Sequence, residues 1–250
     1  MKIWVWALIG TVAHATAASA QGNDACAVAS HLVVAEAALP RVAAAIAKDR
    51  DLRVSVVGTG SSTLPGANGA KMAYPARLEA ALALLFPGVA VKVTAAAMPR
   101  QTAAEIAQVF PRILVDAKPA LVVWQTGTFD AVRGVDPDEF RTVLEEGIVA
   151  LQAGGADVIL MNMQYSPRTE SIIALGSYAE SMRFVALERE VPLFDRLAVM
   201  KYWSETGTFD LYSESKNLDT AAQVHDCLGR LLADLIVAAV KLAEPTKEVR

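Results

Sequence analysis

Clusters of basic residues are absent from this sequence, and their absence argues against a nucleic-acid partner. Its 250 residues include 23 Lys and Arg against 27 Asp and Glu, which gives a formal net charge of −4. A protein that holds nucleic acid needs a basic surface to neutralise the phosphates. We therefore expect no nucleic acid among its partners, and we interpret the charged residues as ordinary solvated faces.

Cofactor motifs are also missing. Gly58 and Gly60 begin a glycine-rich turn, but the third glycine of a dinucleotide-binding fingerprint would fall at Thr63, and no acidic residue follows near Thr94. Lys71 lacks the preceding glycine that a phosphate-binding P-loop requires. No spacing of Cys, His, Asp and Glu is typical of a metal site. The sequence therefore predicts no cofactor and no metal.

The N-terminus has the pattern of a secretory signal. Lys2 precedes an apolar run over residues 3–13, which is too short to span a bilayer, and Ala18-Ser19-Ala20 offers small residues in an A-x-A arrangement. We predict a signal peptide over residues 1–20 that is cleaved before Gln21. The alternative is an anchor that stays uncleaved. Cleavage would leave a periplasmic or secreted protein that is not attached to the membrane.

Cysteine is rare, and its placement predicts a disulfide. The chain contains only two cysteines, Cys26 and Cys227, near opposite ends of the sequence. In an oxidising compartment two such cysteines can pair. We therefore expect a disulfide that ties the N-terminal segment to the last helix.

Short apolar runs rich in Val and Ile recur along the chain, with helix-length segments between them. Strands that are apolar on both faces and alternate with amphipathic helices are typical of a parallel sheet covered on both sides. The pattern predicts a doubly wound α/β fold with about five strands. No repeat, linker or compositional break divides residues 21–250, so we expect one domain. The runs are Val54–Val57, Val89–Val93, Leu121–Trp124, Val158–Met161 and Val191–Phe194.

Helix signals agree with this division. Thr102 and Glu105 form a capping-box pair, and Pro111 should kink or break the helix that they open. Further helices are expected from Pro75 to Pro87-Gly88, from Asp136 to Gly154-Gly155, and from about Thr220 to Lys241.

Several segments, taken in order, resemble an exported bacterial branch of the SGNH/GDSL hydrolase family. The resemblance covers nearly all of the chain after residue 20. It implies a three-layer α/β/α sandwich and the activity of an esterase, lipase or carbohydrate deacetylase. The segments are Gly58-Thr59-Gly60-Ser61-Ser62-Thr63, Tyr74-Pro75-Ala76-Arg77-Leu78, Trp124-Gln125-x-Gly127-Thr128, Leu160-Met161-x-Met163-Gln164-Tyr165, Pro192-Leu193-Phe194 and Cys227-Leu228-x-Arg230-Leu231-Leu232-Ala233-Asp234.

The resemblance assigns the catalytic nucleophile to Ser61, with Ser62 as the alternative. In the family, a glycine amide and an asparagine side chain complete the oxyanion hole. Here Arg100 stands at the glycine position and Phe129 at the asparagine position. Phe129 has no N–H to donate, and the loss of one oxyanion donor typically costs about 2.7–4 kcal/mol of transition-state stabilisation.

The base of the family is a histidine, with an aspartate three residues before it. These positions fall on Asp219 and Lys216. A carboxylate is a poorer base for a serine hydroxyl at neutral pH than an imidazole. Asp219 has a second interpretation, as the N-cap of the last helix. His31 and His225 fit partly buried positions on helices, and only His225 is placed to reach the pocket.

Four further side chains have two interpretations each. Asp130 is either a surface residue or a carboxylate of the pocket. Trp124 and the pair Tyr202-Trp203 are more often core residues than a platform for sugar stacking.

Two hypotheses for the function follow from the sequence. The first is a catalytically degenerate SGNH relative that binds a small ester or carbohydrate ligand, or a protein partner, in the old cleft. The second is an active serine ester hydrolase or deacetylase in which Asp219 or His225 serves Ser61 as an unorthodox base. The changed positions favour the first. The cleft is expected to contain Ser61, Arg100, Phe129, Asp130, Lys216 and Asp219.

Overall fold

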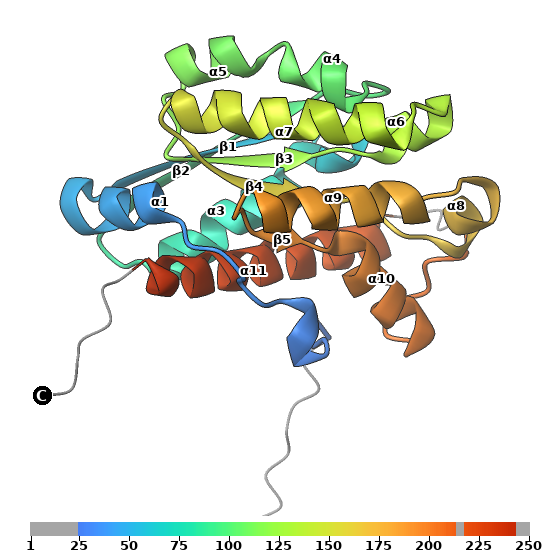
Figure 1. Ribbon diagram of the computed structural model, residues 1–250. Helices are drawn as coiled ribbons and strands as arrows, with labels where there is room; N and C mark the ends of the chain where they lie inside the picture. The colour runs from blue at the N-terminus through green and yellow to red at the C-terminus, as the bar shows by residue number, and fades with distance from the viewer. Residues whose placement is uncertain (1–24, 214–217, 244–250) are drawn as a thin grey trace, which may run out of the picture.

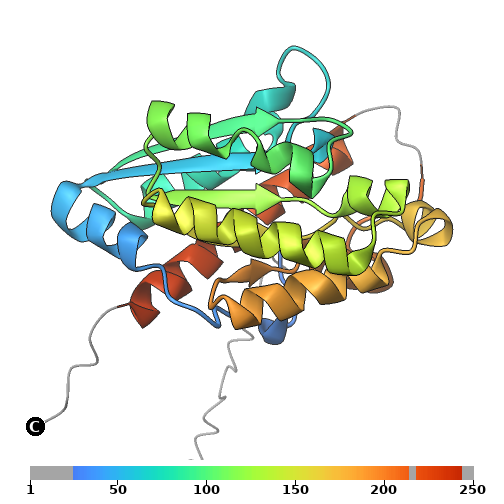
Figure 2. The ribbon, with the colours of Figure 1, turned by 45° about the horizontal axis from the view of Figure 1, so that its top comes forward.

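A five-stranded parallel sheet lies at the centre of the protein, with strand order β2-β1-β3-β4-β5 (Figures 1 and 2). The computed structural model describes residues 25–213 and 218–243. Each predicted apolar run overlaps one strand, although only the second half of Val191–Phe194 is in β5, and every pairing is parallel. The prediction of a doubly wound sheet is therefore confirmed. The strands are β1 (Asp51–Gly58), β2 (Ala90–Ala97), β3 (Leu121–Gln125), β4 (Asp157–Met161) and β5 (Leu193–Phe194).

Helices cover both faces of this sheet, which gives the predicted three-layer sandwich (Figure 1). One layer contains α1 (Pro40–Ala44), α3 (Tyr74–Leu85), α10 (Arg196–Glu205) and α11 (Asp219–Leu242). The other contains α4 (Ala103–Ala107), α5 (Phe110–Asp116), α7 (Pro137–Ala153) and α9 (Gly176–Glu188). Shorter helices are α2 (Gly69–Met72), α6 (Thr128–Arg133) and α8 (Pro167–Ile172), with the turns η1 (Ser30–Leu32), η2 (Ala45–Asp49) and η3 (Gly60–Ser62).

Strand β3 shows how the sequence supplies two cores. Successive strand residues point to opposite faces of a sheet. Leu121 and Val123 pack into the core beneath α3 and α11, whereas Val122 and Trp124 pack into the core beneath α7 and α9. A strand of this kind is apolar at every position, which explains its continuous apolar sequence.

The local signals are also found where the sequence places them. Thr102 caps α4 in a complete capping box with Glu105. Pro111 lies in the first turn of a new helix, α5, which begins at Phe110, so the stretch is broken as predicted. Asp136 caps α7 by accepting hydrogen bonds from two backbone amides of the first turn.

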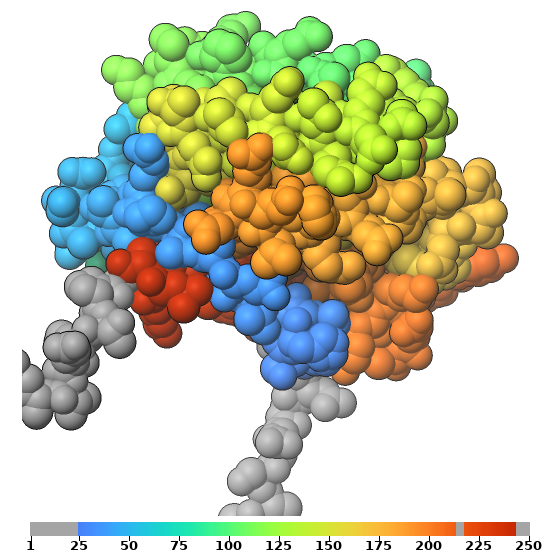
Figure 3. Space-filling view, viewed as in Figure 1, coloured from blue at the N-terminus to red at the C-terminus, as the bar shows by residue number. Residues whose placement is uncertain are grey.

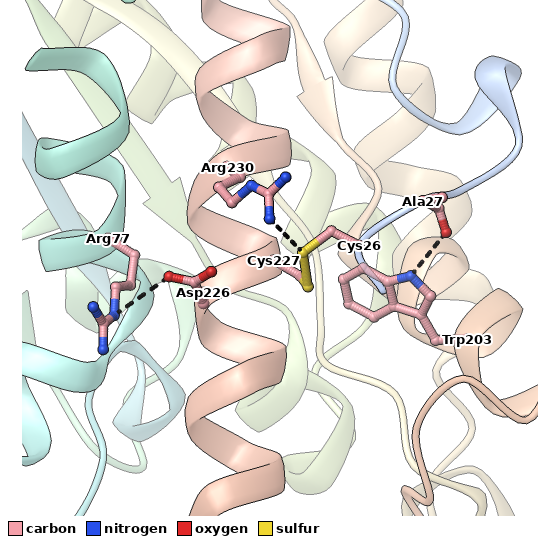
Figure 4. The surroundings of a disulfide bond; sticks show 7 residues. All are labelled: Cys26, Ala27, Arg77, Trp203, Asp226, Cys227 and Arg230. Carbon is pink, nitrogen blue, oxygen red and sulfur yellow. Dashed lines mark hydrogen bonds and ion pairs between the residues drawn. A yellow bond between two sulfur atoms is a disulfide. The ribbon is translucent and has the colours of Figure 1, made fainter. Parts of the chain in front are cut away.

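The predicted disulfide between Cys26 and Cys227 is present, with the two Cα atoms 4.9 Å apart (Figure 4). Both cysteines are buried. Beside it, Trp203 Nε1 donates to the Ala27 carbonyl at 3.3 Å, and Arg230 Nη1 lies 3.3 Å from Cys26 Sγ. The blue N-terminal segment thus lies on the surface against the red helix α11 (Figure 3).

Two predictions fall outside the described part of the chain: the signal peptide over residues 1–20, and Lys216. Within the described part, no helix has the length and apolar character needed to cross a bilayer.

Candidate functional site

Ser61 lies just beyond the carboxyl end of β1. This strand lies between β2 and β3, where the order of the strands in the sheet reverses. From β1 the chain passes to β2 on one side, and from β2 to β3 on the other. Ligands of open α/β sheets bind at such a switch point. The turn packs closely against β3 because residue 58 is glycine: a Cβ there would lie 2.4 Å from Ser62 Oγ and 2.9 Å from Gln125 Cβ.

Gln125, at the end of β3, holds this serine turn through four hydrogen bonds. Its Oε1 accepts from Ser62 Oγ at 2.8 Å and from the Tyr74 hydroxyl at 2.9 Å. Its Nε2 donates to Thr59 Oγ1 at 2.7 Å and to Ser61 Oγ at 2.9 Å. Ser62 is buried and occupied in this network. Of the two serines of the turn, Ser61 is therefore the one that lines the pocket.

A second donor to Ser61 is Arg196, the first residue of α10. Its Nη1 donates to Ser61 Oγ at 3.2 Å. The side chain is 1% exposed, and its Nε and Nη2 have no hydrogen-bond acceptor among the described residues. Burial lowers the pKa of Arg196 to about 10, still far above neutral pH, so the guanidinium is charged. Burial likewise raises the pKa of the neighbouring Tyr74 to about 12.

Sequence reasoning missed Arg196 and the anchoring role of Gln125. Both residues lie at the carboxyl edge of the sheet: Gln125 ends β3, and Arg196 follows β5 after one residue. Their position after a strand could have identified them, because ligands of open α/β sheets bind at this edge. Asp195, the intervening residue, does not pair with Arg196, because its carboxylate caps α10 and accepts hydrogen bonds from Asn162 and Arg183.

His225, on α11, does not act as an acceptor for Ser61. Its Nδ1 accepts a hydrogen bond from the Tyr74 backbone amide at 3.0 Å. Burial, and then the positive charge of Arg196, lower its pKa to about 4. The imidazole is therefore neutral at pH 7 and, since Nδ1 accepts, its proton is on Nε2. Across the described residues, no carboxylate or imidazole forms a hydrogen bond with Ser61 Oγ.

A pocket of about 530 Å³ opens above Ser61 and His225. Apolar side chains form much of its wall, and Tyr165 and Asp210 add polar groups. A larger hollow of about 660 Å³ lies near Pro40 and Asp157, at the opposite end of the strands. It is remote from the serine turn, so we assign the functional site to the smaller pocket. The apolar residues of its wall include Leu64, Met200, Leu211, Leu218 and Val224.

Arg100 and Phe129 lie at the same edge of the sheet but do not line the pocket. Arg100 is exposed, and its φ of 65° is in the left-handed region that favours glycine. This backbone fits the glycine that the family resemblance expects there. The preceding Pro99 lies against Gly60, so the loop borders the serine turn. Phe129 is half-buried on α6.

Asp130 is neither a surface residue nor part of the pocket lining. Its buried carboxylate accepts hydrogen bonds from the Ala103 amide at 2.9 Å and the Gly127 amide at 3.2 Å, and so joins α6 to α4. Burial raises its pKa. Asp219 is exposed and is the first residue of α11; Leu218, not Asp219, occupies the N-cap position.

The remaining candidate residues lie outside the pocket. Trp124 is fully buried, edge-on to Phe110, and Trp203 is fully buried, edge-on to Phe209, so both belong to the core. His31 is exposed on η1. The described residues contain no group of three or more His, Cys, Asp and Glu side chains arranged to hold a metal ion.

Solved structures of SGNH/GDSL hydrolases share this fold. The lipase/acylhydrolase from Enterococcus faecalis is 17% identical, with a TM-score of 0.60, covering 78% of this chain and 99% of its own. TesA is 24% identical, with a TM-score of 0.55 and coverages of 73% and 99%. A catalytic mutant of Axe2, an acetylxylan esterase from Geobacillus stearothermophilus, is 17% identical, with a TM-score of 0.58 and coverages of 74% and 94%. At these identities the likeness establishes the fold alone.

No curated protein matches this chain in sequence. The sequence pattern of one family does match, over residues 25–242, and this range includes the serine turn, Gln125, Arg196 and His225. The chain therefore belongs to the non-GDSL lipase-like family, with the fold of the SGNH/GDSL hydrolases.

Proposed function

We propose that this protein is an exported, catalytically degenerate member of its family, which binds a ligand at Ser61 instead of hydrolysing it. The observation that carries the proposal is the set of partners of Ser61 Oγ. Gln125 Nε2 and Arg196 Nη1 both donate to it, and the third partner is the Thr59 hydroxyl at 3.3 Å. A nucleophilic serine needs a neighbour that takes its proton, and none of these three groups is a base.

The energetic argument combines two losses. Removing the serine or the histidine from a serine-histidine unit can lower the rate by about 10⁶. Replacing the asparagine donor of the oxyanion hole costs about 2.7–4 kcal/mol more. Phe129 stands at that asparagine position, and His225 Nδ1 is occupied by the Tyr74 amide.

The ligand that we propose is a small molecule of the acyl or carbohydrate class. The pocket of about 530 Å³ is in the size range of small-molecule sites, with an apolar wall and a few polar groups. Fold relatives include an acetylxylan esterase and a lipase/acylhydrolase. A protein partner bound over the same opening is the alternative occupant.

Export is part of the proposal. It rests on the signal-like pattern over residues 1–20 and on the disulfide between Cys26 and Cys227. Structural disulfides persist in oxidising compartments such as the periplasm.

Ester hydrolysis by the purified protein, which begins at Gln21 in this proposal, tests the function. With p-nitrophenyl acetate we expect slow turnover or none, and Ser61→Ala should change any observed rate by less than about tenfold, because no base forms a hydrogen bond with the hydroxyl in the part of the chain that the structure describes. Robust turnover abolished by Ser61→Ala would overturn the proposal. His225→Asn and Asp219→Asn would then identify the base of an active hydrolase.

A converse experiment restores the family residues. The triple variant Phe129→Asn, Lys216→Asp and Asp219→His puts back the residue types that the family resemblance expects for the oxyanion donor, the base and its carboxylate partner. We expect it to hydrolyse p-nitrophenyl acetate at least about 100-fold faster than the parent, since a restored donor alone is worth about 10²–10³ in rate. The same triple variant with Ser61→Ala is the matched control and should be inactive.

A further inference from the structure

Resting on the proposed function, we infer that the pocket is a receptor for carboxylates, in which Ser61 and His225 donate hydrogen bonds to the ligand and Arg196 supplies a buried positive charge behind them. The ligand class is thus narrowed to molecules that have a carboxylate head, either an acyl acid or an acidic sugar.

Ser61 is committed to donating. A serine hydroxyl has one proton and two acceptor lone pairs. Gln125 Nε2 at 2.9 Å and Arg196 Nη1 at 3.2 Å occupy the acceptor side of Oγ. Among the described residues its proton has one acceptor within reach, Thr59 Oγ1 at 3.3 Å, which is long for a bond between two hydroxyl groups, so a ligand oxygen at ordinary distance competes with it. The proton of Ser61, which lines the pocket, is available to a ligand.

His225 presents the second donor. The Tyr74 amide fixes Nδ1 as an acceptor, so the proton of the neutral ring is on Nε2. Nε2 has no acceptor among the described residues, and His225 lines the same pocket as Ser61. Two donors in the lining of one pocket match a ligand oxygen that accepts hydrogen bonds, and the buried charge of Arg196 is what favours a charged oxygen over the carbonyl of a neutral ester.

Arg196 explains why the ligand should be charged. Its guanidinium is 1% exposed, forms no ion pair with a carboxylate of the described chain, and leaves Nε and Nη2 without acceptors. Burying an unpaired charge is strongly unfavourable unless an opposite charge compensates it. The charge also polarises the Ser61 hydroxyl, and charge-assisted hydrogen bonds are stronger than neutral ones.

The rest of the pocket accommodates the body of the ligand. Leu64, Met200 and Val224 provide apolar wall, while Tyr165 provides an aromatic ring with a hydroxyl. Asp210 adds one carboxylate to the lining, but it is exposed and accepts hydrogen bonds from the Tyr212 and Ser213 amides. Water screens this charge, so it does not cancel the buried cation.

Calorimetric titration of the folded protein with charged and neutral probes of the same shape tests the inference. Hexanoate and glucuronate represent the acyl and sugar sources of a carboxylate, and hexanamide and glucose are their uncharged counterparts. We expect at least one acid to bind at least about tenfold more tightly than its neutral counterpart. Equal binding of acid and neutral probe, or no binding of either acid at millimolar concentration, would overturn the inference.

Variants then identify the groups responsible. Arg196→Met should weaken binding of the preferred acid by at least about tenfold. Because it also removes an uncompensated buried charge, it should raise the melting temperature of the unliganded protein, by about 2–4 °C. Arg112→Met removes the same charge from an exposed site on α5 and should change neither quantity. Unchanged acid binding by Arg196→Met, or a lower melting temperature, would contradict the role given to Arg196.

Ser61→Ala and His225→Asn complete the series. Each removes one donor, and the asparagine Oδ1 can still accept from the Tyr74 amide. Each should weaken acid binding by about fivefold or more. Failure of this inference differs from failure of the proposed function: an inactive protein that binds no acid contradicts only the receptor, whereas turnover that depends on Ser61 contradicts the degenerate site.

Discussion

His225 should make the stability of the protein fall as the pH is lowered. Burial, followed by the charge of Arg196, lowers the pKa of His225 to about 4 in the folded state. The unfolded value is about 6.5. Between these two values the unfolded chain binds the proton and the folded chain does not, so the free energy of unfolding decreases as the pH falls from about 6.5 towards 4.

The size of the effect follows from the shift. At about 1.4 kcal/mol per pKa unit, the shift of His225 contributes about 3 kcal/mol to the free energy of unfolding at neutral pH. About 2 kcal/mol of this contribution should be lost between pH 7 and pH 4.5. The side chain is only 7% exposed, so solvent screening reduces this value little. Carboxylates that titrate in the same range add their own dependence, so the comparison must be made against a variant.

Urea denaturation of the wild type, His225→Asn and His31→Asn at the two pH values measures the linkage. Asparagine at position 225 cannot titrate but can still accept a hydrogen bond from the Tyr74 amide. Between pH 7 and pH 4.5 the free energy of unfolding of this variant should therefore fall by about 2 kcal/mol less than that of the wild type. His31 is exposed on η1, and its substitution should leave the wild-type pH dependence in place. If the stability of His225→Asn has the same pH dependence as that of the wild type, the claim that His225 is buried in its neutral form is wrong.

Three further predictions concern stability, each measured by urea denaturation. Replacing Cys26 and Cys227 together by serine should lower the free energy of unfolding by about 5 kcal/mol in the loop-entropy model, because the bond closes a separation of 201 residues; a loss under about 1 kcal/mol would contradict this. Arg100→Gly should raise the free energy of unfolding by about 0.5–1 kcal/mol, because the relief of left-handed backbone strain at Arg100 exceeds the entropy that glycine adds to the unfolded chain. A decrease in this free energy would show that the backbone at φ 65° is not strained. Gly58→Ala should lower it by about 1–3 kcal/mol, because the added Cβ would lie 2.9 Å from Gln125 Cβ, and a neutral effect would place the turn further from β3.

Much of the fold could be predicted from the sequence because its signals are local. Val122 and Trp124 alternate with Leu121 and Val123, and a run that is apolar on both faces is typical of a buried parallel strand. The break at Pro111 follows from the missing amide of proline.

The site was harder to predict because its decisive contacts join residues far apart in sequence. Arg196 reaches Ser61 across 135 positions, and His225 reaches the Tyr74 amide across 151. The sequence shows that Arg196 follows the fifth strand, but not that its charge is buried without a carboxylate. Asp130 was equally ambiguous, because a carboxylate that accepts backbone hydrogen bonds in the interior has the same sequence signal as one on the surface.

Covalent labelling with a fluorophosphonate, followed by intact mass measurement and peptide mapping, tests most directly whether Ser61 is a nucleophile. Such reagents need an activated serine. With two N–H donors on its oxygen and no base bonded to it among the described residues, Ser61 should remain unmodified under conditions that fully label an active serine esterase used as a control. The triple variant Phe129→Asn, Lys216→Asp and Asp219→His should become labelled. Stoichiometric modification of Ser61 in the wild-type protein would contradict the account.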